Sequence, residues 1–222
     1  MTIKVDLHVH TSYSMCARLS PRQIEKAALR LGIGAVAITD HNTIAGAREM
    51  QAAVQSLKII CAEEICTAQG EIIGYFLQEG IPPGLSPQET VARIRSQGGL
   101  VAVPHPFDRL RSSRLHKPAL EALVGSIDMI EIFNARNMLI EKNRDLLARL
   151  LAAGAVPIAA SDAHLPIEVG RACMEMEDFS TPREFLDHLH NARIVARKSP
   201  LWVHVATKVL RNYRKLHTKK PQ

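Results

Sequence analysis

Short aliphatic runs alternate with helix-forming stretches along most of the chain. The runs have the length and composition of buried parallel strands; they are "AVAIT" at 35, "LKIICA" at 57, "LVAVP" at 100, "DMIEIF" at 128, "VPIAA" at 156 and "ACMEM" at 172. Helical patterns fall near residues 43–56, 86–98, 117–125, 138–153, 182–191 and 201–216. This alternation predicts an α/β fold with a parallel sheet, either closed as a barrel or open and doubly wound.

Three of the helices are predicted to begin at the same kind of signal: "SPRQ" at 20, "SPQE" at 86 and "TPRE" at 181. In each signal, Ser or Thr precedes a proline at the first helical position, and Gln or Glu completes a capping box. We therefore expect helices to begin at residues 21, 87 and 182.

The N-terminal run "MTIKVDLHVHTSYS" carries polar side chains where a buried strand would carry apolar ones. If residues 3–9 form a strand, alternation places Asp6, His8 and His10 on one face. Two adjacent imidazoles are an unusual core feature, and imidazole is the commonest metal ligand among side chains. The pattern makes His8 and His10 candidate ligands.

Metal-competent side chains follow nearly every predicted strand. Because the carboxyl ends of parallel strands face one side of a barrel or sheet, these residues are expected to converge. Imidazole and carboxylate together suit Zn, Mn or Fe, whereas Mg prefers oxygen ligands. The set predicts two or three divalent ions, and its members are His8, His10, Asp40, His41, Glu63, Glu64, Glu71, His105, Glu131, Asp162 and His164. Asn134 and Arg136 also follow the strand at 128.

Length and composition indicate one globular domain, since the 222 residues are 46% hydrophobic and 23% charged. No segment has the pattern of a signal peptide or the length of a membrane span, so we expect a cytoplasmic protein without a membrane partner. The four cysteines lack CxxC spacing and are expected to be reduced thiols. The sequence does not indicate an oligomeric state.

The net charge of +6 comes from the C-terminal segment. Residues 202–222 contain six Lys or Arg and no acidic residue, whereas the rest of the chain has equal numbers of acidic and basic residues. A basic helix of this kind is expected to be a solvated end, with attraction of a nucleic acid as the less favoured interpretation.

The ordered motifs "DLHVHTSYS", "ITDHNT", "AEEI", "GEIIG", "PHPF", "EIFNAR", "SDAH" and "GRA" resemble those of the PHP (polymerase and histidinol phosphatase) superfamily. The resemblance covers roughly Ile3 to Arg171. Within the superfamily, the short chain is similar to the stand-alone metal-dependent phosphoesterases. It implies a distorted (β/α)7 barrel, which we expect over residues 1–200. Residues 201–222 would then form a basic C-terminal helix and not a separate domain.

The resemblance also implies a division of ligands among the ions. His8, His10, Glu64 and Asp162 would hold the first ion, and Glu64 would bridge to a second ion. The second ion would also be held by His105 and Glu71, although many members have a histidine in place of Glu71. A third ion would be held by His41 and His164.

Cys16 stands where many members have another ligand of the third ion. Its thiolate would favour Zn or Fe(II), because soft sulfur selects softer ions. The alternative is that Cys16 is a small apolar filler beside a third site with two ligands. The sequence leaves both interpretations open.

Further residues are expected to support the ligands or the substrate. Asp6 and Asp40 would orient ligand imidazoles. Glu131 is expected behind the ligands, where it and Asn134 would position a nucleobase, a sugar hydroxyl or a water, or tie down the loop. Substrate phosphate requires cations, and an arginine matches phosphate geometry. Arg136 is the leading candidate, and the others are Arg109, Arg111, Arg171 and, as a polar contact, Asn134.

The expected reaction is hydrolysis of a phosphomonoester of a small metabolite or mononucleotide by attack of a metal-bridging hydroxide. Glu64, Asp162, His164 and Arg136 are the expected catalytic residues. The alternative is a nuclease or oligonucleotide phosphodiesterase guided by the basic tail. A non-catalytic structural PHP module and an amidohydrolase-type barrel are less favoured, because nearly every ligand is retained and no bridging lysine is present.

Overall fold

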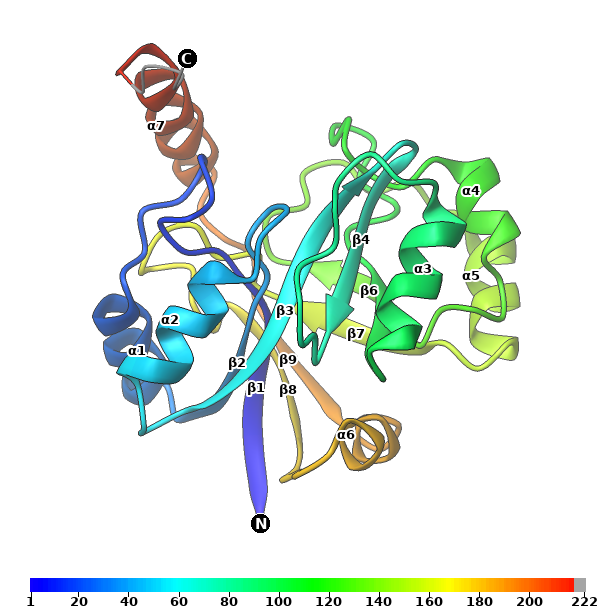
Figure 1. Ribbon diagram of the computed structural model, residues 1–222, viewed down its shortest axis with the longest axis horizontal. Helices are drawn as coiled ribbons and strands as arrows, with labels where there is room; N and C mark the ends of the chain where they lie inside the picture. The colour runs from blue at the N-terminus through cyan, green and yellow to red at the C-terminus, as the bar shows by residue number, and fades with distance from the viewer. Residues whose placement is uncertain (218–222) are drawn as a thin grey trace.

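Nine strands and seven helices make up residues 1–217, the part of the chain that the computed structural model describes (Figure 1). The strands are β1 (Thr2–Val9), β2 (Ile33–Ile38), β3 (Lys58–Thr67), β4 (Gly70–Tyr75), β5 (Leu100–Val103), β6 (Met129–Asn134), β7 (Val156–Ala160), β8 (Ala172–Glu177) and β9 (Arg193–Ala196). The helices are α1 (Pro21–Arg30), α2 (Ala45–Ala53), α3 (Pro87–Ser96), α4 (Lys117–Ala122), α5 (Arg144–Ala152), α6 (Pro182–Leu189) and α7 (Trp202–His217). The end of the expected basic tail, residues 218–222, lies outside the described residues.

The described strands form one continuous sheet in the order β7-β6-β5-β4-β3-β2-β1-β8-β9. Strands β1 to β3 are parallel, as are β5 to β7, and β4 lies antiparallel between β3 and β5. Strand β8 is antiparallel to β1, and β9 is antiparallel to β8. The predicted α/β barrel is confirmed, but it is a mixed, nearly closed barrel of nine strands.

Strand β4 runs against its neighbours because it forms a tight hairpin with β3. Thr67 pairs with Gly70 across the turn, and Gly70 has a φ of 114°, which side chains disfavour. Such a short connection permits only antiparallel pairing. Sequence reasoning took "GEIIG" as a ligand motif without recognising the strand, and it also missed β9.

The barrel closes where the segment after β7 meets the end of β1. Val9 and Ala163 form a parallel bridge. The His10 N–H donates to the Ala163 carbonyl at 2.9 Å, and the Ala163 N–H donates to the His8 carbonyl at 3.1 Å. These bonds place the first and last predicted ligand motifs side by side.

The observed helix starts follow the predicted signals at α1, α3 and α6. Ser20 and Ser86 form complete capping boxes with Gln23 and Glu89. At α6, Thr181 caps the helix, but the partner carboxylate accepts the Ser180 N–H instead. Helix α5 begins later than predicted, after residues 138–143, where the Asn143 side chain accepts the Leu146 N–H.

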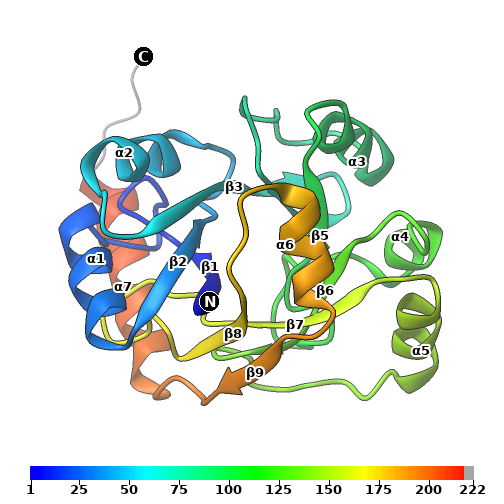
Figure 2. The same cartoon turned by 90° about the horizontal axis from the view of Figure 1, so that it is seen from below.

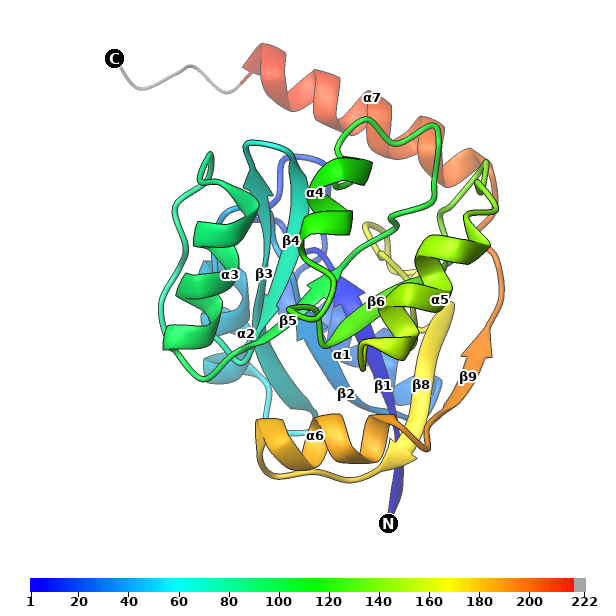
Figure 3. The ribbon, with the colours of Figure 1, turned by 90° about the vertical axis from the view of Figure 1, so that its right-hand side faces the viewer.

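Two helices lie across opposite ends of the barrel. Helix α6 crosses the end nearest the N-terminus (Figure 2), where Phe179 and Phe185 close the interior core with ring centroids 4.9 Å apart. Helix α7 lies across the other end (Figure 3), toward which β1 and β2 run. No helix among residues 1–217 is both long and apolar enough to cross a membrane.

Candidate metal centre

Four side chains converge at the point where the barrel closes. The Nε2 atoms of His8 and His10 lie 3.0 Å apart. Glu64 Oε2 lies 3.5 Å and 3.4 Å from these two nitrogens, and Asp162 Oδ1 lies 3.6 Å and 3.4 Å from them. All four residues are fully buried. The structure therefore brings together the four residues expected to hold a first ion.

A second group of donors shares Glu64 with the first. His105 Nε2 lies 3.0 Å from Glu64 Oε1 and 3.6 Å from Glu71 Oε2. His41 Nδ1 lies 3.1 Å from Glu64 Oε2 and 3.6 Å from Glu71 Oε1. Glu64 thus presents Oε2 to His8, His10 and His41 and Oε1 to His105, as a bridging carboxylate does.

A third group overlaps the first two. Donor atoms of His10, His41 and His164 lie within 4.8 Å of one another. The Cys16 Sγ lies 3.1 Å from His164 Nε2, and Cys66 forms a further group with His41 and Glu71. Cys66 was not a predicted ligand, although it directly follows the quoted motif "AEEI"; it was expected to be a reduced thiol.

The polar atoms of the cluster lack the partners that buried groups need. Among the described residues, His41 Nδ1, Glu64 Oε2, Glu71 Oε2 and Asp162 Oδ1 are buried without a hydrogen bond. Three of these are carboxylate oxygens, which carry no proton to share when ionised. Buried charges are normally paired or bound to a metal. The donor set therefore fits divalent cations.

Burial and neighbouring charges shift the pKa values of the carboxylates in the cluster. Burial alone would raise the pKa of Asp162 and that of Glu64. The neighbouring Arg111 and His8 nevertheless hold the pKa of Asp162 well below its ordinary value. His8 and His41 likewise hold the pKa of Glu64 well below its ordinary value. Burial and the Glu64 charge raise the pKa of Glu71 to about 7. These carboxylates favour positive charge in the space between them.

The ligand imidazoles are oriented from behind. His8 Nδ1 lies 2.7 Å from Glu131 Oε1, and the other oxygen of Glu131 accepts the backbone N–H of His105 at 2.8 Å. His10 Nδ1 lies 3.2 Å from Ser14 Oγ, which donates to Asp40 at 2.5 Å. Carboxylates that contact a ligand imidazole fix its orientation and raise its basicity.

Backbone strain coincides with two candidate ligands. His105 has a φ of 33° and Asp162 a φ of 55°, although both are non-glycine residues. Left-handed φ values are uncommon for such residues and cluster at functional sites. The sharp turns direct both side chains into the barrel mouth immediately after β5 and β7.

Asp6 does not orient an imidazole, contrary to expectation. Its carboxylate accepts the Ser161 hydroxyl at 2.6 Å and the Gly170 N–H at 2.8 Å. The pairing register of β1 shifts between Asp6 and Val9, so simple alternation does not relate Asp6 to the two histidines. Asp6 instead holds the segment that carries Asp162.

The predicted phosphate-binding residues occupy different environments. Arg111 Nη2 pairs with Asp162 Oδ2 at 2.6 Å, beside the metal centre. The buried Arg136 donates to both oxygens of Glu168, at 2.7 Å and 2.9 Å, and to Thr207 Oγ1 at 2.8 Å. Arg136 is thus already engaged, although part of it reaches the cleft.

The other predicted substrate contacts lie away from the cleft lining. Asn134 is fully buried and donates to Glu131 at 2.9 Å and to Asp162 at 3.2 Å. Arg109 is exposed, and Arg171 lines a separate pocket with Gly170. Asn134 therefore positions two carboxylates of the site, and the structure does not bring Arg109 or Arg171 to it.

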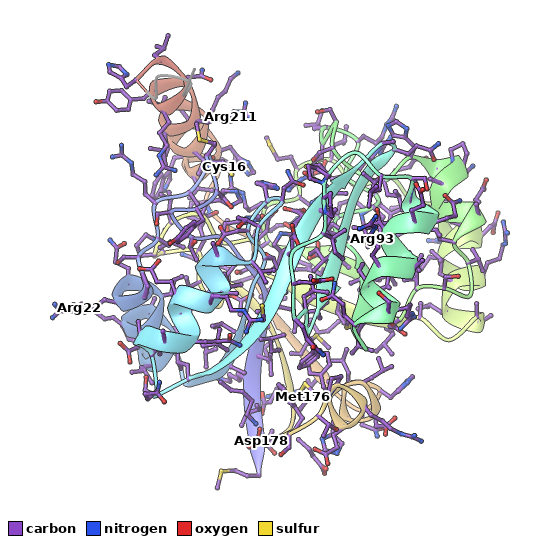
Figure 4. The ribbon with its side chains drawn as sticks, viewed as in Figure 1. Cys16, Arg22, Arg93, Met176, Asp178 and Arg211 are labelled. Atoms are coloured by element: carbon purple, nitrogen blue, oxygen red, sulfur yellow. The ribbon has the colours of Figure 1, made fainter. Side chains whose placement is uncertain are left out.

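The metal centre opens into a cleft of about 600 Å³. In Figure 4, Cys16 and Arg211 lie near one another on the inner side of α7, whereas Arg22 projects away on the far side of α1. The cleft is lined by Cys16, His41, Glu71, Asp108, Leu110, Arg111, Ser112, Ser113, Arg136, Met138, His164, His204, Thr207, Lys208 and Arg211. The predicted solvated end therefore forms one wall of the candidate site.

Sequence reasoning missed several residues that support the site. Ser14 and Ser161 were within quoted motifs, but nothing marked them as partners of Asp40 and Asp6. Gly46 was also missed: a Cβ at this position would clash with Asp40 and Thr11, so the close approach of α2 requires glycine. Such contacts depend on packing between elements and leave no local pattern.

Comparisons with known proteins agree with this geometry. Residues 6–80 match the PHP domain family, and residues 141–194 match a PHP-associated family. Two relatives are uncharacterised proteins of Methanocaldococcus jannaschii. MJ1587 is 41% identical over 150 residues, which cover 60% of this chain and 82% of the relative. MJ0417 is 35% identical over 197 residues, which cover 84% of this chain and 79% of the relative.

Solved structures show the same fold at lower identity. PsfC from Pseudomonas syringae PB-5123 has a TM-score of 0.67 at 15% identity, covering 96% of this chain and 98% of that one. A two-domain Bacteroides vulgatus protein containing a predicted PHP-like metal-dependent phosphoesterase has a TM-score of 0.63 at 20% identity, with coverages of 89% and 65%. Endonuclease Q in complex with a 27-mer duplex has a TM-score of 0.62 at 16% identity, with coverages of 86% and 57%.

The family match begins at Asp6 and includes the strand ends that supply His8, His10, His41, Glu64 and Glu71. The two Methanocaldococcus jannaschii relatives extend the similarity over most of the chain. The resemblance inferred from the motifs is confirmed: this chain belongs to the PHP domain family.

Proposed function

We propose that the protein is a metal-dependent phosphoesterase that hydrolyses a phosphomonoester of a small metabolite or mononucleotide. The observation that carries this proposal is the position of Glu64, whose two oxygens face separate donor groups at 3.0 Å to 3.5 Å. A carboxylate shared in this way supports a pair of divalent ions.

The residues divide naturally into ion sites. His8, His10, Glu64 and Asp162 would hold one ion, and Glu64, Glu71 and His105 a second. His41 and His164, with Cys16 as a further donor, would hold a third. Mixed imidazole and carboxylate donors favour Zn, Mn or Fe. Such ions, when bound, supply Lewis acidity and lower the pKa of water so that hydroxide is available near neutral pH.

The chain supplies the remaining functions. Hydrolysis forms a bond from water oxygen to phosphorus and breaks the ester P–O bond, releasing inorganic phosphate and an alcohol that takes up the proton. Arg111 is the cation best placed for the phosphate, because it lies against Asp162 and lines the cleft. Glu168 and Thr207 hold Arg136 in one orientation beside it.

The test is phosphate release from a panel of phosphomonoesters with Mn, Zn or Fe(II) added singly. We expect hydrolysis that chelation abolishes, together with loss of at least about 100-fold in Glu64→Gln. Glu63→Gln is the matched control, because Glu63 is the preceding residue of β3 and lies outside the donor groups. Absence of metal-dependent hydrolysis across the panel would exclude this function and favour a structural module.

A nuclease is the second candidate function. The cationic side chains of Lys208 and Arg211 line the cleft, and the fold is shared with endonuclease Q, whose structure contains a 27-mer duplex substrate with an abasic lesion. Hydrolysis of short RNA and DNA should be compared with that of mononucleotides. Preferential cleavage of internal phosphodiester bonds would support the nuclease over the phosphomonoesterase.

A further inference from the structure

Helix α7 is held against the metal centre at two points. Near its beginning, Thr207 Oγ1 accepts a hydrogen bond from Arg136 at 2.8 Å. Near its end, Arg214 Nη1 donates to the carbonyls of Ser14 at 2.8 Å and Ala17 at 3.0 Å. Ser14 and its neighbours form the loop after β1, which also carries Cys16. The helix is therefore docked on the cleft through both of its halves (Figure 3).

One face of α7 lines the cleft from His204 to Arg211. His204, Lys208 and Arg211 are spaced by four and three residues, which places them on the same side of a helix. The opposite side carries exposed apolar residues, including Val209 and Tyr213, which are 62% and 52% exposed. A helix that was merely a solvated end would turn its cations outward, so this distribution ties them to the cleft.

The α7 cations differ from the inner arginines in their charge balance. Arg111 is paired with Asp162, and Arg136 is paired with Glu168. Within the part of the chain that the structure describes, no carboxylate pairs with Lys208 or Arg211. Asp108, an acid of the cleft lining, accepts backbone N–H groups of Leu110 and Met138. The outer wall of the cleft thus carries uncompensated positive charge.

From this arrangement we infer that Lys208 and Arg211 bind a second anionic group of the substrate. The cleft of about 600 Å³ is of the size that holds a whole small ligand and exceeds what a single phosphate group fills. The substrate class is then a phosphomonoester that carries another phosphate or a carboxylate. The inference rests on the proposed phosphoesterase function and adds that α7 determines substrate preference.

The first test measures binding and does not require turnover. An alkylphosphonate and α,ω-alkanediyl bisphosphonates of increasing chain length are titrated calorimetrically into the Mn-loaded protein. We expect the bisphosphonate of matching length to bind about tenfold more tightly than the alkylphosphonate. In Lys208→Gln and Arg211→Gln, most of this preference should disappear. Arg22→Gln, which removes an exposed cation from α1, should retain it.

The second test measures hydrolysis of the corresponding alkyl phosphate and bisphosphates. The ratio of kcat/KM values should favour the bisphosphate in the wild-type protein and fall about tenfold in each α7 variant. Failure to hydrolyse either ester would exclude the proposed function while leaving the binding preference to be judged from calorimetry. Equal binding of the two phosphonates by the wild-type protein, or equal weakening of both by the α7 substitutions, would overturn the inference. If only oligonucleotides showed dependence on α7, the nuclease would replace it.

Discussion

Glu63 and Glu64 are consecutive residues of β3 that face different surroundings. Glu64 lies 3.0 Å to 3.5 Å from the imidazoles of His8, His41 and His105. Glu63 is equally buried, but its Oε2 accepts the Ile81 N–H at 2.9 Å and its Oε1 has no hydrogen-bond partner in the described chain. The alternation of side chains along a strand separates one carboxylate that joins the metal centre from one that does not.

Substitution of Glu64 should therefore remove metal, whereas substitution of Glu63 should not. Glu64→Gln keeps the shape of the side chain but removes the negative charge that two donor groups share. We expect elemental analysis of the purified variant to show at least one equivalent fewer of divalent metal than the wild-type protein. Glu63→Gln should match the wild type. An unchanged metal content in Glu64→Gln would contradict the bridging arrangement.

Glu63 should make stability depend on pH. Burial raises its pKa to about 7 from an ordinary value of 4.5, so the unfolded chain releases the proton at lower pH than the folded chain does. Wild-type stability contributed by the protonated form is present below pH 4.5 and is lost as the pH rises toward 7. Glu63→Gln has no such loss, so its free energy of unfolding should gain roughly 3 kcal/mol relative to wild type between these limits.

Denaturant unfolding of both proteins at several pH values checks this prediction at constant metal concentration. The difference between the two proteins in free energy of unfolding at each pH isolates the contribution of the Glu63 carboxyl, because both proteins share the changes in metal binding with pH. Glu79→Gln, on the exposed surface, is the control. Wild-type and Glu63→Gln free energies of unfolding that run parallel from pH 4.5 to 8 would rule the assignment out.

Glu131 should control metal affinity without contacting metal. It holds His8 Nδ1 at 2.7 Å and accepts the His105 N–H, so it orients two ligand residues at once. Glu131→Gln should weaken metal binding by about 10- to 100-fold, measured by competition with a chromophoric chelator. Glu121→Gln, on the surface of α4, should leave the affinity at the wild-type value. Equal affinities for Glu131→Gln and wild type would show that the imidazoles are held by other contacts.

The strand ends made most of the ligand set predictable, because each motif directly follows a recognisable aliphatic run. His8, His105 and Asp162 could be expected to meet, since parallel strands deliver their ends to one side. The position of α7 was not predictable in this way. In the sequence, its basic residues have the pattern of a solvated helix. The contacts of Arg214 and Thr207 with the barrel place these residues toward the cleft.

The same limit explains why the contacts of Asp6 and Arg136 were not foreseen. A register shift inside β1 removes Asp6 from the pattern that alternation predicts, and such a shift has no reliable sequence signature. Arg136 follows its strand as expected, but Glu168, which neutralises it, comes from a distant loop. Pairing partners that are far apart in sequence decide whether a charged side chain is available to a substrate.

Arg214 should be needed to keep α7 docked. Its guanidinium bonds to three backbone carbonyls, those of Ser12, Ser14 and Ala17, which no shorter side chain can reach together. Arg214→Gln should increase cleavage of α7 by trypsin severalfold while the barrel remains resistant, because the helix loses one of its two anchors. Arg22→Gln should not change the cleavage rate. Cleavage of Arg214→Gln at the wild-type rate would mean that the Thr207 anchor suffices.

Gly46 provides the most specific test of how the site is supported. A methyl group at this position would clash with the Asp40 carboxylate and the Thr11 hydroxyl, which are hydrogen-bonded to each other at 2.5 Å. Displacement of Asp40 would release Ser14 and hence the His10 imidazole. Gly46→Ala should therefore reduce metal affinity by about tenfold, as expected for loss of an orienting contact. In Gly34→Ala the new methyl group would meet only the Ile3 side chain, at 3.3 Å, so this control should bind metal normally. If both variants lost stability to the same extent but kept wild-type metal affinity, Gly46 would be required for packing of α2 and not for the position of His10.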